Sequence, residues 1–342
     1  MLSYLNISHM NWTNQIRNYI KIAGSLFIFS CLIACEKKVY DLVDPASSGV
    51  WTLFNTENGL PGNRVNDIKL GNDGNLWAAF SGNGAATYSN GVWTIYKTSN
   101  SAIINSDATS LGPVSGGSMI IGTADGLSLK TTNDEWVSYK DPMVTVMYVN
   151  TVKVTSNGWV WVGTNNHGFY YDDGTGFENI NAPGYENVYI IEEDFKGNVW
   201  LGTDNGLLKW DGVNLSDLTT SNGLPGNVVT AIYPDSKQRL WIGTFGGETA
   251  AWIDNSGIHH LSLMNGKTET YITDIFEDRR GDIWFATWFD GLVRFDGAIS
   301  HSFKEYNGFF ENDVNSIGED REGNLWFGLY SKGMVKYTLP LE

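Results

Sequence analysis

A short pattern recurs seven times along the 342 residues: a turn, an apolar pair that usually includes Trp, a small residue, and an Asn-Gly or Asp-Gly turn. The anchor positions are Trp77, Ile120, Trp161, Trp200, Trp241, Trp284 and Trp326. Their successive spacings are 43, 41, 39, 41, 43 and 42 residues. A sustained period near this length, built from short β-prone runs, is typical of a β-propeller with one four-stranded blade per repeat. The chain is therefore predicted to be all-β, a single seven-bladed propeller.

The fifth repeat shows how one unit divides into four strands. β-prone runs cover 228–233, 239–244, 250–253 and 258–263, with turn residues between them. Apolar residues occupy both faces of the Trp-containing run, as expected for a sheet that packs between two neighbours. A Gly two residues after the anchor would let the neighbouring sheet approach closely. Five copies have it: Gly122, Gly163, Gly202, Gly243 and Gly328.

An acidic residue precedes Gly-Asn or Gly-Asp in the turn between the first two runs of several repeats. The examples are Asp73, Asp194, Asp278 and Asp320. Regular carboxylates suggest calcium, but each turn is too short to supply the roughly six to eight oxygens that Ca²⁺ requires. An Asp side chain that accepts a hydrogen bond from the backbone two residues later explains the recurrence without a metal. We therefore expect no metal site and no cofactor.

The two ends of the repeat array complement each other. The last repeat offers strands near 314–319, 325–329 and 334–337, and it lacks a fourth. The run Trp-Thr-Leu-Phe at 51–54 resembles the runs at 93–96 and 136–139 that end the first two repeats. We predict that 51–54 completes the seventh blade, because a closed ring leaves no open edge between its first and last blades.

The N-terminus is unlike the rest of the chain. Arg17 and Lys21 precede an uncharged apolar run at 22–34, which is shorter than the about 20 residues that a membrane span needs. A basic segment followed by a short apolar run is typical of an export signal. Met10 is an alternative start to Met1.

The apolar run ends in Leu-Ile-Ala-Cys, which resembles the lipobox of bacterial lipoproteins. The resemblance implies a signal peptide at 1–34 and lipidation of Cys35, followed by a flexible tether within 35–49 and the propeller at 50–342. Contact with the membrane would then occur only through the lipid anchor, most simply at the outer membrane. The sequence does not distinguish the periplasmic face of that membrane from the surface face. An ordinary signal peptide, or a buried apolar segment that contains Cys by chance, is the alternative.

The net charge restricts the classes of partner that the chain can bind, and the cysteine content restricts its disulfides and metal sites. The net charge is −16, and residues 35–342 carry 20 basic and 38 acidic residues, a net of −18, because 1–34 contain two basic and no acidic residues. A field of this sign repels nucleic acid and anionic lipid head groups. Both cysteines lie at or before position 35, so no thiol remains for a disulfide or a thiolate metal site. A monomer is expected.

Two longer motifs carry a family resemblance. They are NGLPGNRVNDI at 58–68 and NGLPGNVVTAI at 222–232, accompanied by NVWLGTDNGLLKWDG at 198–212. This pattern resembles the two-component regulator propeller repeats over about residues 50 to 338. In that family the repeats form the extracytoplasmic sensor of hybrid histidine kinases. The resemblance implies a propeller with a tendency to bind an external ligand, but no kinase is implied, since the chain shows none of the signalling segments.

Loop residues suggest a binding face at one end of the propeller. Aromatic residues gather in the loops expected there, including Phe309 and Phe310, and polar residues precede the inner strands: Asp107, Asn187, Glu269 and Asp313. Exposed aromatic rings beside acids and amides suit sugars, which present apolar faces and hydroxyl edges. The predicted ligand-binding residues are Arg64, Tyr148, His167, Phe245, Trp288, Phe289 and Tyr330. The alternative is that these aromatic residues only pack the ends of the blades.

The most favoured function is an extracytoplasmic binding module for a glycan or for an envelope protein. A scaffold without a small ligand, which uses the same exposed aromatics, is one alternative. An enzyme is another, because the repeats loosely resemble virginiamycin B lyase, a family whose catalysis needs a His/Glu group on the channel face with a metal. His259, His260 and His301 fall on predicted outer strands and only His167 on a suitable loop, so we expect no catalytic residues.

Overall fold

The computed structural model describes four segments of the chain, residues 49–139, 147–247, 250–263 and 270–338. The chain divides into two units, Met1–Tyr40 and Asp41–Glu342, and only the second contains described residues. The predicted signal peptide, Cys35 and almost all of the predicted tether lie outside them. In the described ranges, none of the helices has the length and apolar character required to traverse a bilayer.

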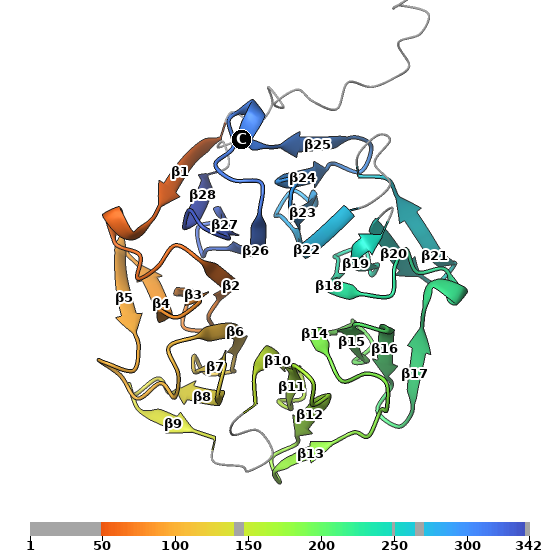
Figure 1. Cartoon of the computed structure of the whole chain (residues 1–342), viewed down its shortest axis with the longest axis horizontal. Coiled ribbons are helices and arrows are strands. Elements are labelled where there is room, and N and C mark those ends of the chain that lie inside the picture. The colour runs from red at the N-terminus through yellow and green to blue at the C-terminus, as the bar shows by residue number, and fades with distance from the viewer. Residues whose placement is uncertain (1–48, 140–146, 248–249, 264–269, 339–342) are drawn as a thin grey trace, which may run out of the picture. The chain divides into compact units, whose positions relative to one another are not determined.

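Runs rich in Val, Ile, Trp and Tyr alternate with Gly-containing turns and form seven four-stranded blades around an axis (Figure 1). Blade 1 comprises β2 (Val65–Leu70), β3 (Leu76–Phe80), β4 (Gly84–Ser89) and β5 (Val92–Tyr96). Blade 2 comprises β6 (Ala108–Pro113), β7 (Met119–Thr123), β8 (Gly126–Lys130) and β9 (Trp136–Ser138). Blade 3 comprises β10 (Val149–Val154), β11 (Val160–Thr164), β12 (Phe169–Asp172) and β13 (Phe177–Asn179). Blade 4 comprises β14 (Val188–Glu193), β15 (Val199–Thr203), β16 (Gly206–Trp210) and β17 (Leu215–Leu218).

The remaining blades follow the same antiparallel order from the axis outward. Blade 5 comprises β18 (Val229–Pro234), β19 (Leu240–Gly247), β20 (Ala250–Asp254) and β21 (Gly257–Leu261). Blade 6 comprises β22 (Thr270–Glu277), β23 (Ile283–Thr287), β24 (Leu292–Phe295) and β25 (Ser300–Phe303). Blade 7 comprises β26 (Val314–Glu319), β27 (Leu325–Leu329), β28 (Met334–Thr338) and β1 (Val50–Phe54). Three 3₁₀ turns link blades: η1 (Thr56–Asn58), η2 (Thr220–Asn222) and η3 (Glu305–Asn307). The predicted all-β, seven-bladed fold is confirmed.

The N-terminal strand closes the ring as predicted. β1 pairs antiparallel with β28, so that Trp51 lies opposite Tyr337 and Phe54 opposite Met334. The Trp51 ring stacks on Tyr337 at 4.2 Å between centroids and also contacts Phe303 of blade 6 at 5.5 Å. The first strand of the domain is therefore a structural part of the last blade and of its contact with the blade before it.

Close packing between blades depends on the predicted glycines. A Cβ atom on Gly243 would lie 2.5 Å from Ile272, in the innermost strand of the next blade. Gly202 stands in the same relation to Val229, at 2.7 Å from its carbonyl oxygen, and Gly328 to Val65, at 2.7 Å. Any larger residue would push neighbouring blades apart, so the glycine sets the distance between sheets.

The recurring Asp joins the turn to the core tryptophan in blades 4 to 7. In blade 5, Asp235 accepts the backbone N–H of Lys237 at 3.0 Å and the indole N–H of Trp241 at 2.8 Å. The same indole bond joins three further pairs: Asp194–Trp200, Asp278–Trp284 and Asp320–Trp326. The Asp therefore satisfies both the turn and the one donor of the buried Trp.

Blade 1 departs from the predicted alignment of the acidic turn. Asp73 lies four residues before Trp77, whereas the other acids lie six before their Trp, and Gly71 occupies that position. Asp73 still accepts the N–H of Asn75 at 3.0 Å, but the indole nitrogen of Trp77 is buried without a partner. Asp73 thus shapes a local turn and does not reach the core.

Candidate functional site

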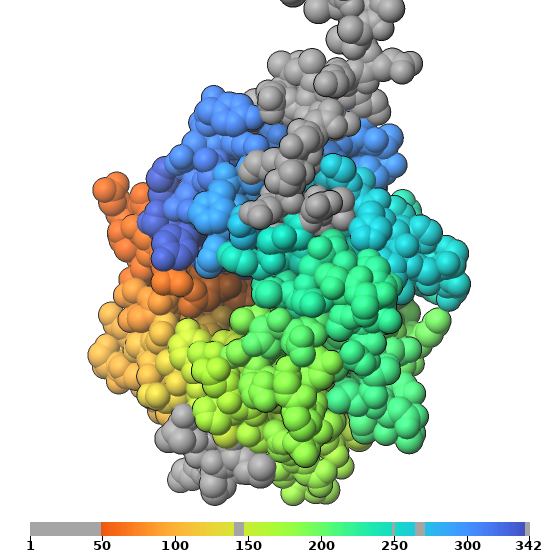
Figure 2. Space-filling view, turned by 45° about the vertical axis from the view of Figure 1, so that its right-hand side comes forward, coloured from red at the N-terminus to blue at the C-terminus, as the bar shows by residue number. Residues whose placement is uncertain are grey.

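Two cavities lie along the axis of the ring, where the surface is hollowed (Figure 2). The larger, about 610 Å³, is lined by the innermost strands of all seven blades and is called the channel below. The other, about 440 Å³, lies at the end where those strands begin and is called the mouth. Seven residues line both cavities, one from each blade: Asn66, Thr109, Asn150, Tyr189, Thr230, Thr273 and Asn315.

These seven residues, the bulge ring, occupy the same place in every blade. Each innermost strand shifts register at this residue, between the flanking pairs that bond to the second strand. A bulge leaves one residue unpaired and re-aims its side chain, here toward the axis. The sequence pattern of alternating apolar and polar residues does not show this, because a bulge interrupts the alternation.

Side chains of the bulge ring tie each blade to the next. The Asn66 amide donates to the carbonyl of Ala108 at 2.7 Å, and Thr230 donates to the carbonyl of Ile272 at 2.5 Å. Asn150, Thr273 and Asn315 make the equivalent bond. The hydroxyl of Thr109, which is 9% exposed, has no partner.

A second ring of residues borders the mouth. In six blades the residue that follows the second strand donates its N–H to the carbonyl just before the bulged segment of the innermost strand, and in blade 5 the donor, Phe245, lies within β19. The paired residues are Arg64/Ser81, Asp107/Ala124, Tyr148/Asn165, Asn187/Asp204, Val228/Phe245, Tyr271/Trp288 and Asp313/Tyr330. The rim is therefore divided: aromatic side chains come from blades 5 to 7, and mostly polar ones from blades 1 to 4.

The aromatic arc of the rim is continuous. Phe245 contacts Tyr271 at 4.4 Å and Trp288 at 5.6 Å between ring centroids, both edge to face. Trp288 reaches Tyr330 at 6.1 Å, and the guanidinium of Arg64 lies 4.5 Å from the Tyr330 ring centroid. The Trp288 indole N–H donates to Asn315 of the bulge ring at 2.9 Å. This bond and the ring contacts hold the aromatic faces in place.

Three polar residues predicted beside the site bind the backbone instead. Asp107 accepts the N–H of Gly82 at 3.0 Å, Asn187 that of Asn166 at 3.0 Å, and Asp313 that of Phe289 at 2.7 Å. Each fixes a loop of the preceding blade. Glu269 lies outside the described residues.

The structure brings together most of the residues predicted to bind a ligand. Tyr148, Phe245 and Trp288 line the mouth, Tyr330 adjoins Trp288, and Arg64 lies over the Tyr330 ring. Phe289 is 59% exposed beside Tyr271, at 5.3 Å.

His167 stands apart from this group. It lines neither described cavity, and its Nδ1 lies 3.0 Å from the carbonyl oxygen of Asn165 in its own loop. Phe309 is also separate, because it is buried in the blade 7 core. The sequence analysis did not single out Tyr271 of the rim or the seven residues of the bulge ring, Tyr189 among them, because the alternation of apolar and polar residues does not mark a bulge.

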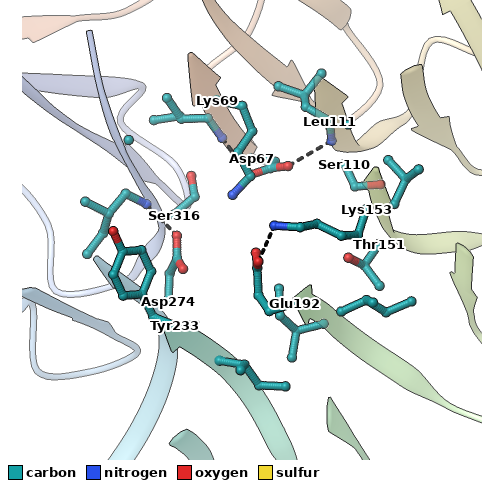
Figure 3. A pocket seen from close by; sticks show the side chains of 18 of the residues that line it. Asp67, Lys69, Ser110, Leu111, Thr151, Lys153, Glu192, Tyr233, Asp274 and Ser316 are labelled. Carbon is teal, nitrogen blue, oxygen red and sulfur yellow. Dashed lines mark hydrogen bonds and ion pairs between the residues drawn. The ribbon is translucent and has the colours of Figure 1, made fainter. Parts of the chain in front are cut away.

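Charged side chains meet in the channel (Figure 3). Lys153 pairs with Glu192 of the next blade, and Lys69 Nζ lies 3.4 Å from Asp67 Oδ1. Asp274 accepts the N–H groups of Ile275 and Ile317, both at 2.8 Å.

Burial shifts the pKa values of several groups along the axis. It raises the pKa of Asp274 to about 6, against the opposing effect of Lys69. Burial disfavours the charged form of Lys69, but nearby carboxylates, Asp67 foremost, outweigh it and raise the pKa. At the rim, burial and Asp107 raise the pKa of Tyr148, so its hydroxyl stays protonated at neutral pH.

Histidine and metal chemistry find little support in the described residues. His259 and His301 lie on the outer strands β21 and β25. Ser256 Oγ and Asp254 Oδ1 both approach Nε2 of His259, at 2.9 and 3.1 Å, so that one nitrogen meets both groups and cannot relay a proton between them. Within the described ranges no group of three His, Cys, Asp or Glu side chains could hold a metal ion.

Comparison with known families agrees with this architecture. Three segments, residues 223–246, 266–289 and 308–331, match the family described as two component regulator propeller. They correspond to the first two strands of blades 5, 6 and 7. The protein therefore carries two-component regulator propeller repeats in these blades. Comparison with curated protein sequences finds no significant match.

Several solved structures share the fold. The extracellular domain of a protein described as a hybrid two component system, BT3049 from B. thetaiotaomicron, is 21% identical with a TM-score of 0.69, over 84% of this chain and 42% of that one. The chain thus spans less than half of that domain. A streptogramin B lyase is 16% identical with a TM-score of 0.72, over 87% of this chain and 100% of the lyase. YCF48 bound to a D1 peptide is 14% identical with a TM-score of 0.63, over 88% and 98%. Likeness at this level shows the propeller fold alone.

Proposed function

We propose that this protein is an extracytoplasmic binding module that recognises a glycan at the mouth of the propeller. The observation that carries the proposal is the mouth itself, a concave site in which an aromatic arc faces polar groups from every blade. Aromatic faces stack on the apolar faces of sugar rings, and a few placed polar groups fix their orientation. A flat apolar patch, which would favour a protein partner, is not what lines this cavity.

The hydrogen-bonding character of the bulge ring supports a hydroxyl-rich ligand. Asn66 and Asn150 use their amide N–H groups on the next blade, and no described residue donates to their Oδ1 atoms. The Thr230 and Thr273 hydroxyls also donate to main-chain carbonyls, which leaves their oxygens as acceptors. The ring therefore presents mainly acceptors to the axis, and sugar hydroxyls supply the matching donors.

The proposed location follows from the N-terminal sequence. The export-type segment and the lipobox-like Cys35 would place the propeller outside the cytoplasm on a lipid anchor. The similar domain from B. thetaiotaomicron is extracellular, which is consistent with this placement. Labelling with a radioactive or alkyne fatty acid, compared between the native chain and a Cys35→Ala variant, tests the anchor directly; incorporation into both would contradict it.

A titration of the purified chain with neutral oligosaccharides tests the binding function. Trp288→Ala removes the centre of the aromatic arc and should weaken a bound glycan about tenfold or more, by analogy with nucleic-acid bases, which gain on the order of 1–3 kcal/mol from stacking on an aromatic side chain. Phe195→Ala is the matched control, because Phe195 is 59% exposed in the turn between β14 and β15, away from the mouth. Equal loss in both variants would contradict a site at the mouth, and silence across the library would favour a protein partner.

The proposal assigns no catalysis to the site. The lyase likeness extends to the fold, and His167 stands apart from the channel charges. Incubation with quinupristin, the compound present in the structure of a Staphylococcus aureus virginiamycin B lyase with which this chain shares 15% identity, gives a direct check. We expect unchanged chromatographic retention and fragmentation of the compound; conversion to a ring-opened isomer would reinstate an enzyme.

A further inference from the structure

The channel beneath the mouth holds an unequal set of charges. Four carboxylates, Asp67, Glu192, Asp274 and Glu319, and two ammonium groups, Lys69 and Lys153, line it. Glu192 pairs with Lys153, Asp67 pairs with Lys69, and Glu319 pairs with Arg279 at 2.8 Å. Among the described residues, Asp274 has no cation within 4.0 Å. One carboxylate is therefore left over.

Asp274 in β22 occupies the same position as Asp67 in β2, directly after the bulged residue. The two carboxylates differ in whether an ammonium group lies beside them. Asp67 accepts the N–H of Ile68 and, across the blade boundary, that of Leu111, both at 2.8 Å. Asp274 accepts the N–H of Ile275 and, across its boundary, that of Ile317 at the same distance. The backbone thus fixes both carboxylates identically, and only Asp67 has an ammonium partner beside it. Each oxygen of Asp274 keeps a free lone pair.

The surroundings of Asp274 suit an organic cation. Tyr233 and Phe276 line the same cavity with ring centroids 5.5 Å apart, and aromatic faces attract ammonium groups. A fixed carboxylate beside these two aromatic rings therefore forms a site with no protein cation within 4.0 Å among the described residues.

We propose that the channel binds an ammonium group with Asp274 as its counter-ion, and hence that the glycan recognised at the mouth is an amino sugar with a free amine. This inference rests on the proposed function, since the bulge ring lines both cavities and lets one ligand enter both. An ammonium ion supplies three donors and one positive charge to a cavity whose lining carboxylates outnumber its ammonium groups.

The protonation of Asp274 agrees with such a site. A carboxylate that lacks a counter-ion is disfavoured by burial, and burial raises the pKa of Asp274 to about 6. The charged or titratable groups that face it along the channel are Asp67, Lys69, Lys153, Glu192, Tyr233 and Glu319. A bound ammonium group would favour ionised Asp274, so the affinity of the channel for an ammonium group should rise between about pH 5 and pH 7.

Three trisaccharides that differ only at one substituent test the proposal on the purified full chain. They are the β-1,4-linked trimers of glucosamine, N-acetylglucosamine and glucose, compared by calorimetry at about pH 7. We expect the glucosamine trimer to bind at least tenfold more tightly than the other two. Asp274→Asn should remove that preference, so that the glucosamine trimer binds no more tightly than the glucose trimer does. Lys69→Met should act in the opposite direction and tighten the glucosamine trimer, because it removes a competing cation.

The outcomes separate this inference from the proposed function. Equal affinity for all three trimers would overturn the ammonium site and leave glycan binding intact, as would an amine preference that survives Asp274→Asn. If no trimer binds, methylammonium chloride at matched ionic strength is the remaining probe. A thermal shift with methylammonium that vanishes in Asp274→Asn would support the ammonium site and reject the glycan; no shift would overturn both. The glucose trimer and the melting temperature of each variant report whether the fold is intact.

Discussion

Blades 5 to 7 and blades 1 to 3 form the same four-stranded sheets with different side chains at two levels. In the core, each of blades 5 to 7 has an Asp bonded to its Trp, whereas the equivalent positions in blades 1 to 3 are Gly71, Val114 and Thr155. At the rim, blades 5 to 7 supply the aromatic arc, and blades 1 to 3 supply mainly polar residues. The segments that match the propeller repeat family fall in blades 5 to 7 alone.

The difference shows which parts of the repeat the fold requires. Blade 2 has Ile120 in place of Trp, so Val114 leaves no donor unsatisfied. Blade 1 keeps Trp77 without an acceptor, and the ring instead stacks on Tyr96 at 5.6 Å. All seven blades keep the bulge and the rim hydrogen bond. The bulge and the rim hydrogen bond, which both join the first two strands of a blade, are thus common to all seven blades, while the Asp–Trp bond is an added stabilising element in blades 4 to 7.

The strand that closes the ring should be the most sensitive point. Trp51→Ala removes a ring that contacts Tyr337, Phe303 and two further aromatic residues, and we expect a loss of about 4 kcal/mol in the free energy of unfolding. Trp136→Ala is the equivalent change in blade 2, where one ring contact, to Tyr96, is found, and it should cost about half as much. Urea unfolding measures both. Equal costs would show that closure adds nothing special to this position.

Replacing the turn Asp should lower the free energy of unfolding far more in blade 5, where it bonds to the core Trp, than in blade 1, where it does not. Asp235 is fully buried and accepts bonds from Lys237, Arg239 and Trp241. Asp235→Ala leaves these donors without an acceptor and should lower the free energy of unfolding by about 3 kcal/mol, as measured by urea unfolding. Asp73→Ala, in an exposed turn, should cost about 0.5 kcal/mol. A small effect at Asp235 would mean that the indole bond contributes little.

The buried carboxylate of Asp274, in blade 6, should make the free energy of unfolding depend on pH. Burial raises the pKa of Asp274 to about 6, above about 4 in the unfolded chain, so the folded state binds more protons between these values. Its contribution to stability is full below about pH 4 and is lost as the pH rises through 6. Relative to the native chain, Asp274→Asn should therefore gain about 2 kcal/mol between pH 4 and pH 7. A pH-independent difference, from urea unfolding at both values, would contradict the raised pKa.

The smallest change in stability among the four comparisons is expected when blade 1 is given the Asp–Trp spacing of blades 4 to 7. Gly71→Asp together with Asp73→Lys reproduces the spacing of blade 4, in which Asp194 and Lys196 precede Trp200. The buried indole N–H of Trp77 would gain an acceptor, and the free energy of unfolding should rise by about 1 kcal/mol. Gly71→Asp alone should destabilise, because a Cβ there would meet the Asp73 carboxylate at 2.4 Å. If both variants lose stability, the blade 1 backbone does not accept the motif.

The sequence alone determined the features that repeat at fixed spacing. The Trp anchors determined the number of blades, and the likeness of 51–54 to 93–96 determined the closure, because both arise from local patterns that each blade must satisfy. The predicted aromatic residues Tyr148, Phe245 and Trp288 line one mouth because the start of each innermost strand and the end of each second strand lie at the same end of the blade.

Only the tertiary structure decided what faces the axis. A bulge turns one residue per blade toward the mouth, and such a residue looks like any other strand position in a linear pattern. The charge balance of the channel is likewise invisible in sequence, because Lys153 and Glu192 are 39 residues apart and Asp274 is isolated by its place in the ring. Periodicity encodes how each blade is built, whereas the site depends on side chains from seven separate blades that meet at one axis.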